Sequence, residues 1–550
     1  MIHQKIALGL FSVCVLAIGT NLFLNSCNSS GNKKSKGAAM VSDGPANAQQ
    51  PEPQPLGDAA RGREVFRFET FGNERFWFNT MRMQQGMEEA KVTPKMMLEL
   101  GLHIDMEAVE PTLKQALEAE FKTDLSMQSA PLLNDPKTTA MLINSNAIIG
   151  MVAKDSNKDK KLDITKGDMV GLSCAVCHTV TDAYAFNMPT GGSAGKRIDG
   201  PAPLTLNIGK LLATAKNSRA YYANLQLSMD GKTVGRAAKG IEVTSTEAEV
   251  DAYLTNLANY PVGTFDETHD GIGNSVKNVP LFRQDLAAPS GTSGQNALVE
   301  DIGNSSYTAN LDMTTLATPE GRQFLFLRAG AAGVKIHENY KKILAETGVT
   351  GYPYVQASMV GKPGEPHNAV GRRVDDQKLK DMTAYLFSLS APAGAKVNTE
   401  MAARGRELFR SNCTGCHNVD QSIAVDAKLI DLKTLWTGYA PVQTDITRGD
   451  PKQTAVINSP GDFDDKMIIV DASDHGEPRG NALPLLLDLE RTTMFLHNGA
   501  VKSLDELLNP ARGKDEPHSF YFKDEAERND VVEFLKGLDT NTGKGNKRVH

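Results

Sequence analysis

Two short segments of the chain carry residue types at a spacing that predicts a covalently bound cofactor. Each segment is a Cys-x-x-Cys-His motif, one at residues 174–178 and the other at residues 413–417. In this motif both thiols add to the vinyl groups of a haem, and the adjacent histidine binds the iron. The residues predicted to hold two c-type haems are therefore Cys174, Cys177, His178, Cys413, Cys416 and His417.

Two other uses of these cysteines explain less of the pattern. A zinc site needs two Cys-x-x-Cys pairs, or histidines, close enough to complete one tetrahedron. A redox disulfide does not need a histidine after both pairs. The chain has six cysteines, and the two outside the motifs, Cys14 and Cys27, belong to the N-terminal leader. The motifs thus use every cysteine of the remaining chain.

The leader has the pattern of an export signal that ends at a lipidated cysteine. Lys5 precedes a mostly apolar run at residues 6–24, and the run is followed by Asn-Ser-Cys, in which the cysteine is Cys27. This pattern predicts a lipoprotein signal peptide over residues 1–26 and lipidation of Cys27. A plain signal peptide and a single N-terminal membrane helix are the alternatives, since the run is about as long as a membrane span. All three place the remaining chain outside the cytoplasm, and the first predicts a periplasmic or cell-surface lipoprotein.

The organisation of the chain follows from an internal repeat. Residues 59–67 read AARGREVFR and residues 402–410 read AARGRELFR. The second copy is followed at once by its haem motif, whereas the first is separated from its motif by an insertion at about 68–170. We therefore expect a flexible tether at 27–57 and two haem domains, at 58–392 and 398–550.

The fold class predicted from these segments is mainly α, with two cytochrome c-like domains in tandem. Each half closes with apolar residues spaced for one helical face: Leu379, Met382, Leu386 and Leu389, then Val531, Phe534, Leu535 and Leu538. We expect the first helix of each half to cross this last helix, with Gly62 and Gly405 allowing the close approach.

The first domain is enlarged by the insertion and by long loops. Within the insertion, Thr93 followed by Pro94 predicts a helix start, and residues 113–121 predict another helical stretch. Residues 178–370 are rich in Gly, Pro, Asn and Thr, so loops and short helices are expected there, with little sheet.

The remaining ligands of the irons decide the function, because an iron with an open face can bind peroxide or O₂. His497 is the predicted second ligand of the C-terminal haem, since it lies in an apolar and aromatic stretch before a glycine. Met494 is the alternative ligand, and a histidine buried at a domain interface is the alternative role of His497. His518 and His550 are expected to be solvated.

For the first haem no histidine stands out among His269, His337 and His367. This favours an open iron above His178, which becomes the predicted catalytic residue. An acidic run from Asp155 to Asp163 resembles half of a calcium loop, although Lys160 and Lys166 replace the expected Gly and Glu, so a solvated turn is the alternative to calcium. The net charge of −7 argues against a nucleic-acid partner.

With these motifs the chain resembles the di-haem cytochrome c peroxidase group, and its first half is similar to the rubber-oxygenase-like di-haem cytochromes. The resemblance covers most of residues 59–540 and implies one haem that passes electrons and one that meets the oxidant. It describes architecture and not substrate. The segments that carry it are residues 68–77, 171–178, 197–200, 206–209, 495–499 and 503–510.

The predicted function is that of a di-haem c-type oxidoreductase, in which electron transfer is coupled to the reduction of hydrogen peroxide at one haem. An O₂-dependent oxygenase acting on an apolar or alkene substrate, and an electron carrier without enzymatic activity, are the alternatives. The partners expected are a small redox protein that donates or accepts electrons, H₂O₂ or O₂, and a membrane through the lipid anchor.

Overall fold

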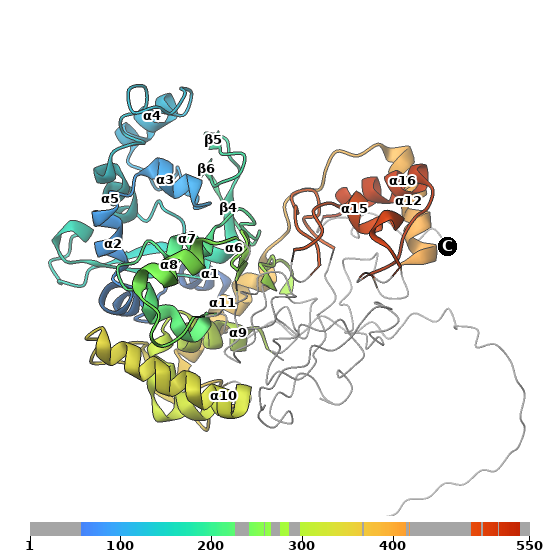
Figure 1. Ribbon diagram of the computed structural model, residues 1–550. Coiled ribbons are helices and arrows are strands. Elements are labelled where there is room, and N and C mark those ends of the chain that lie inside the picture. The colour runs from blue at the N-terminus through green and yellow to red at the C-terminus, as the bar shows by residue number, and fades with distance from the viewer. Residues whose placement is uncertain are drawn as a thin grey trace, which may run out of the picture. The chain divides into compact units, whose positions relative to one another are not determined.

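The computed structural model describes most of the chain between residues 57 and 539. Helices joined by long loops predominate, and the strands are short, so the predicted mainly α class is confirmed (Figure 1). The described residues are 57–225, 241–257, 259–265, 276–284, 298–365, 368–413, 417, 486–496, 499–514, 516 and 518–539.

The helices of the first half begin with α1 and end with α11. The α-helices are α1 Ala59–Phe68, α2 Met83–Glu89, α3 Pro94–Glu99, α4 Pro111–Glu120, α5 Pro136–Asn144, α6 Ala175–His178, α7 Ile208–Leu212, α8 Glu247–Thr255, α9 Val299–Ser305, α10 Pro319–Glu346 and α11 Asp376–Ser388. The π- and 3₁₀-helices are η1 Phe76–Thr80, η2 Ile164–Lys166, η3 Ser218–Asn224, η5 Ser306–Asn310 and η6 Met313–Ala317.

Short strands pair around the first haem motif and at the edges of the domain. They are β1 Ile104–Asp105, β2 Met151–Lys154, β3 Met169–Leu172, β4 Thr179–Thr181, β5 Phe186–Asn187, β6 Ser193–Gly195, β7 Arg197–Asp199, β8 Thr264–Phe265, β9 Val276–Lys277, β10 Ala357–Met359 and β11 Arg372–Val374. The sheets among them are β1-β6-β5, β2-β3, β4-β7, β8-β9 and β10-β11. The antiparallel pairs β2-β3 and β4-β7 lie directly before and after α6 in the chain, so they hold the motif at both ends.

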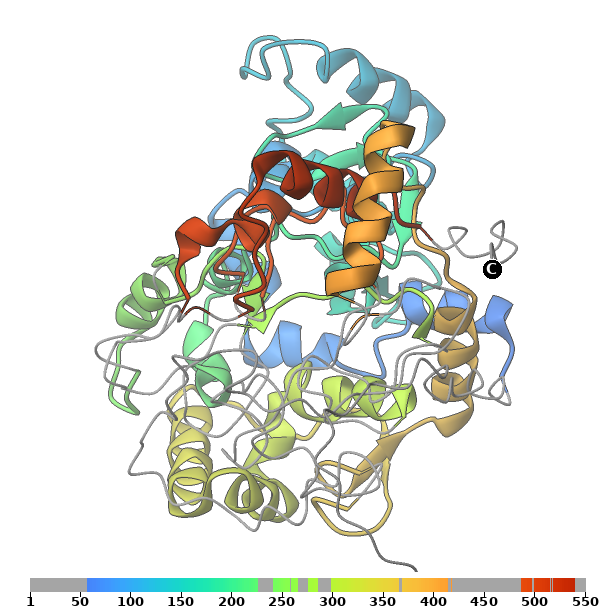
Figure 2. The same cartoon turned by 90° about the vertical axis from the view of Figure 1, so that its right-hand side faces the viewer.

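The described helices of the second half are α12 Thr399–Asn412, α15 Leu504–Leu508, η9 Pro510–Arg512 and α16 Glu525–Lys536. Figures 1 and 2 show α12 against α16, in the orange and red part of the chain. In the same way α1 packs on α11 in the first half. Each half therefore joins its first helix to its last, as the repeat predicts.

Glycine allows the close approach in both pairs. A Cβ atom at Gly62 would lie 1.8 Å from the carbonyl oxygen of Asp381, and one at Gly405 would lie 1.9 Å from that of Asp530. No side chain fits at such a distance, because carbon and oxygen atoms in contact are separated by more than 3 Å. The predicted role of these two glycines is confirmed.

An arginine next to each glycine pairs with the aspartate that faces it. Arg61 Nε donates to Asp381 at 2.8 Å, and Arg404 Nε donates to Asp530 at 2.7 Å. Both carboxylates are buried although both arginines are largely exposed. The repeat therefore preserves a helix–helix contact consisting of a glycine, an arginine and an aspartate.

This contact predicts a pH dependence of stability. The hydrogen bond from Arg61 lowers the pKa of Asp381 to about 2, and the backbone N–H of Asp58 acts in the same direction. In the unfolded chain the aspartate carboxyl has a pKa of about 3.9. The stabilisation by this carboxylate is therefore complete above that value and is lost as the pH falls toward 2. Thermal unfolding of Asp381→Asn and the parent protein should differ most above pH 5 and converge near pH 2; a difference that is constant over this range would contradict the assignment.

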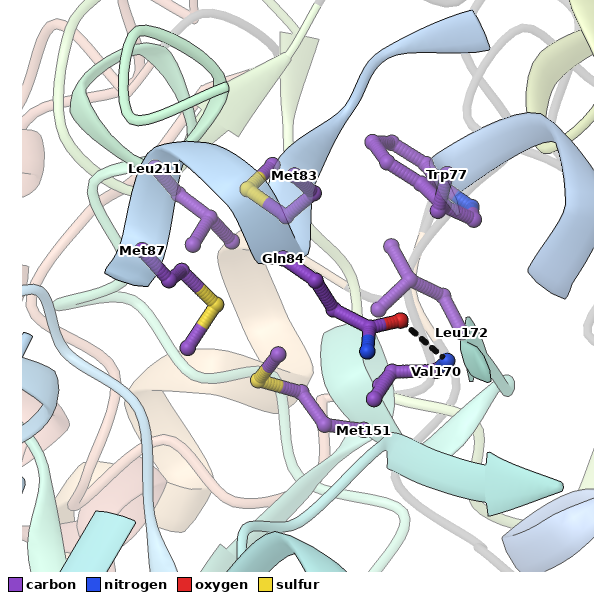
Figure 3. A pocket seen from close by; sticks show the side chains of 8 residues that line it. All are labelled: Trp77, Met83, Gln84, Met87, Met151, Val170, Leu172 and Leu211. Carbon is purple, nitrogen blue, oxygen red and sulfur yellow. Dashed lines mark hydrogen bonds between the residues drawn. The ribbon is translucent and has the colours of Figure 1, made fainter. Parts of the chain in front are cut away.

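The insertion contributes short helices and the strand pair β2-β3 to a core that it shares with residues up to 370. Thr93 caps α3 with Pro94 in its first turn, as predicted, and α4 covers most of the second predicted stretch. Gln84 accepts a hydrogen bond from Val170 N at 2.9 Å and donates to Asp168 O, so α2 is joined to β3 (Figure 3). Trp77 and three methionines lie around this amide in a small apolar pocket.

One expectation about the first domain is wrong. Residues 178–370 were expected to hold loops and short helices, but α10 extends over 28 residues. Gly330 adopts a positive φ of +55° within this helix, and a second glycine, Gly333, follows one turn later. The glycines suggested a loop, whereas buried apolar residues on both sides of them hold the helix in the core, among them Leu325, Ile336 and Leu344.

Candidate haem sites

The first haem motif forms a single helical turn. Cys174 is the N-cap residue of α6, and Cys177 and His178 are its last two residues. The two cysteines are three positions apart in one helical turn, a spacing at which side chains are neighbours on one face of a helix. Neither forms a disulfide in the part of the chain that the structure describes. Two thiols on one face beside an imidazole are the arrangement that attachment to a haem requires.

The imidazole of His178 is hydrogen-bonded to a segment 101 residues away in sequence. Its Nδ1 is 3.0 Å from the carbonyl oxygen of Val279, and the neighbouring Asn278 donates to the carbonyl of Cys177. A carbonyl partner fixes the proton on Nδ1 and leaves Nε2 as the nitrogen that can bind a metal. Burial lowers the pKa of His178 to about 4, against the opposing effect of this hydrogen bond, so the ring is neutral at neutral pH.

The turn lies between two parts of the hydrophobic core. Cys174 packs on the α1–α11 side, where its Sγ is 3.4 Å from Tyr307 Oη and 3.7 Å from Met382 Sδ. Cys177 packs against the large core that the insertion shares with residues up to 370. Burial raises the pKa of both thiols, that of Cys177 to about 12. They are neutral in the polypeptide alone, and the site suits an apolar macrocycle.

A buried carboxylate secures the backbone that follows His178. Asp199, on β7, accepts hydrogen bonds from Arg67 Nε at 2.6 Å, Tyr385 Oη at 2.5 Å and Thr179 Oγ1 at 3.0 Å. These donors come from α1, α11 and β4, so Asp199 joins the paired helices to the strand that begins directly after His178. The helix pair and the haem turn are therefore parts of one hydrogen-bonded unit.

The second motif begins at the end of α12. The backbone N–H of Cys413 donates to Phe409 O at 2.8 Å, and that of His417 donates to Cys413 O at 2.9 Å. The first bond continues the pattern of α12, and the second joins the described ends of the motif. Cys416 lies outside the described residues.

His417 has an unexpected neighbour. Its ring centroid lies 6.3 Å from that of His518, with 59° between the ring planes. Burial lowers the pKa of His518 to about 4, and the nearby His417 acts in the same direction. His518 is only partly exposed, so the expectation that it is solvated is wrong in part. Its local sequence of acidic residues, proline and serine resembles a surface loop, and only the tertiary fold brings it to His417.

The other candidate ligands either lie outside the described residues or make contacts away from the two motifs. His497 lies outside the described residues, as do His269, His367 and His550, so their roles stay predictions. Met494, the alternative ligand, is buried with its Sδ against Gly263, where an added Cβ would lie 2.9 Å away. His337 lies in α10 and its Nδ1 bonds the carbonyl of Leu316 at 2.7 Å.

The acidic run from Asp155 forms a turn held by its own backbone. Asp155 accepts from Lys160 N at 3.0 Å, and Asp159 accepts from Lys161 N at 2.8 Å. In the part of the chain that the structure describes, no three His, Cys, Asp or Glu side chains gather in a way that could hold a metal ion. Calcium at this turn stays a prediction.

The leader, with Cys27, and the tether up to residue 56 precede the described residues, whereas Gly57, the last residue assigned to the tether, lies against the backbone of Lys380 in α11. Among the helices that are described, none combines the length and the apolar character needed to cross a membrane. The lipid anchor stays a prediction.

Comparisons with known proteins give little similarity. No protein-family model matches the chain, and no curated protein matches it. A chain of hydrazine synthase from Kuenenia stuttgartiensis, solved under 20 bar of xenon, aligns with 51% of this chain and 77% of its own, at 14% identity and a TM-score of 0.27. An alignment at that score carries no argument about this protein. The resemblance to the di-haem peroxidase group rests on the sequence motifs alone.

Proposed function

We propose that the protein is a di-haem c-type oxidoreductase that reduces hydrogen peroxide at its first haem. The observation that carries the proposal is the turn at Cys174–His178, which holds both cysteines within three positions of each other and an imidazole oriented by Val279. Cys174 and Cys177 would hold the first haem as thioethers, and His178 would be its proximal ligand. Cys413, Cys416 and His417 would do the same for the second.

A haem supplies an iron that changes its oxidation state and can bind an oxygen species on an open face. The residues of this chain then have separate tasks. The carbonyl of Val279 keeps the proton of His178 on Nδ1, so Nε2 is the nitrogen that would bind the iron. Tyr307 and Met382 pack on the thiol of Cys174 and exclude water from that edge.

The overall reaction takes two electrons and two protons for each peroxide and yields two waters. A small redox protein is the proposed electron donor, and the second haem is the proposed entry point. The lipoprotein signal supports a position at the outer face of a bacterial membrane, with Cys27 as the anchor.

The function is tested with the two-electron-reduced protein under anaerobic conditions. One equivalent of H₂O₂ should reoxidise both haems, and a reduced donor protein should sustain turnover. Reoxidation that is no faster than that of a haem peptide without the fold would contradict the proposal.

The two alternatives give different results in the same preparation. Uptake of O₂ with an apolar alkene and without added reductant would identify an oxygenase. A protein that exchanges electrons with a donor but ignores both peroxide and O₂ would be a carrier, because both axial positions of each iron would then be filled.

A further inference from the structure

We propose that His518 is the second axial ligand of the haem attached at the C-terminal motif. This proposal rests on the proposed function, since it requires that a haem is bound at His417. It replaces His497, the ligand that the sequence predicts.

The distance between the two rings carries the argument. A bond between a metal and an imidazole nitrogen is about 2 Å long, so a metal between two imidazoles separates their ring centroids by about 6 Å. The centroids of His417 and His518 are 6.3 Å apart. In such a pair each ring would contain the metal–nitrogen axis and could rotate about it, so the angle of 59° between the rings is compatible with a shared metal.

The backbone of His518 is fixed in a rare conformation. Its φ is +56°, in the left-handed region that residues other than glycine seldom adopt. Such a conformation persists where the surrounding structure requires it, often at functional sites. The ring of His518 has Phe520 edge-on at 5.4 Å and His417 at 6.3 Å between ring centroids.

The segment after His518 is anchored to the core of the second half. Tyr521 Oη donates to Gly513 O at 2.7 Å, and Phe522 N donates to Leu508 O at 3.0 Å. Phe522 is buried, and Asp524 caps α16 directly afterwards. The helix α16 packs on α12, which leads into His417, so both histidines are positioned by the same helix pair.

The alternative ligand Met494 packs against two glycines. Its thioether lies against Gly263 and its methyl group against Gly499, where an added Cβ would lie within 3 Å of each. A shift of Met494 to His417 would remove it from both contacts. Two histidine ligands would make the second iron six-coordinate and low-spin, so it would transfer electrons without binding the oxidant.

The test is an optical and EPR spectrum of the oxidised full-length protein with its haems attached. His518→Ala should convert one low-spin haem to high-spin, and added imidazole should restore the low-spin signal. His518→Met should stay low-spin but gain a methionine–iron charge-transfer band. His337→Ala, which removes a buried histidine of α10, is the matched control and should leave both haem signals unchanged.

Three results would each contradict a different part of the proposal. Two haems per chain together with an unchanged low-spin signal in His518→Ala and His518→Met overturn the ligand assignment. Conversion to high-spin in His497→Ala, and not in the His518 variants, overturns it in favour of His497. Absence of covalent haem from the parent protein instead contradicts the proposed function. If His518→Ala fails to accumulate, the spectrum of His518→Met decides.

Discussion

We expect His178→Ala to abolish peroxide turnover while the second haem keeps its low-spin spectrum. As the proposed proximal ligand, His178 would hold the first iron, and its Nδ1–H bond to the carbonyl of Val279 would tune its donor strength. Without the imidazole the haem would stay attached through Cys174 and Cys177 but would lose its axial anchor. Steady-state reduction of H₂O₂ by a reduced donor measures the effect.

A matched variant at the other motif tests the division of labour between the haems. His417→Ala should slow the entry of electrons but leave the spectral response of the first haem to peroxide. Turnover that survives in His178→Ala would mean that the roles of the haems are reversed or shared.

The second large effect concerns stability. Gly62→Val or Gly405→Val would place a branched side chain where even a Cβ atom lies within 2 Å of a backbone oxygen. The helices of that half must then move apart, and overpacking of this kind costs about 1–3 kcal/mol or more. In the first half the separation also disturbs the bonds of Arg67 and Tyr385 to Asp199. Chemical denaturation of the holoprotein measures the loss.

Controls for this prediction are available on the same helices. Ala60 and Ala403 are exposed neighbours in α1 and α12, so valine there should cost less than about 1 kcal/mol. Equal losses for the glycine and alanine variants would mean that helix propensity, and not the close approach, explains the result.

The paired helices were predictable from sequence because they combine a local period with a repeated segment. Residues such as Leu379 and Val531 lie at helical spacing, and both are fully buried. Gly62 and Gly405 occur in identical surroundings in the two copies, which indicated a shared structural role.

Contacts between segments that are far apart in sequence could not be predicted, because neither periodicity nor a repeat marks them. The carbonyl of Val279 is far from His178 in sequence, and no side-chain type identifies a backbone acceptor. His518 lies in a polar stretch and approaches His417 only through the packing of α16 on α12. The long helix α10 was missed because Gly330 and Gly333 interrupt its pattern.

The most direct test of the central claim is one EPR spectrum of the oxidised protein, quantified against its covalent haem content. Two haems per chain, one high-spin and one low-spin in equal amounts, are predicted, with only the high-spin signal changing when peroxide is added to the half-reduced protein. Two low-spin signals that ignore peroxide, or a chain without covalent haem, would contradict it.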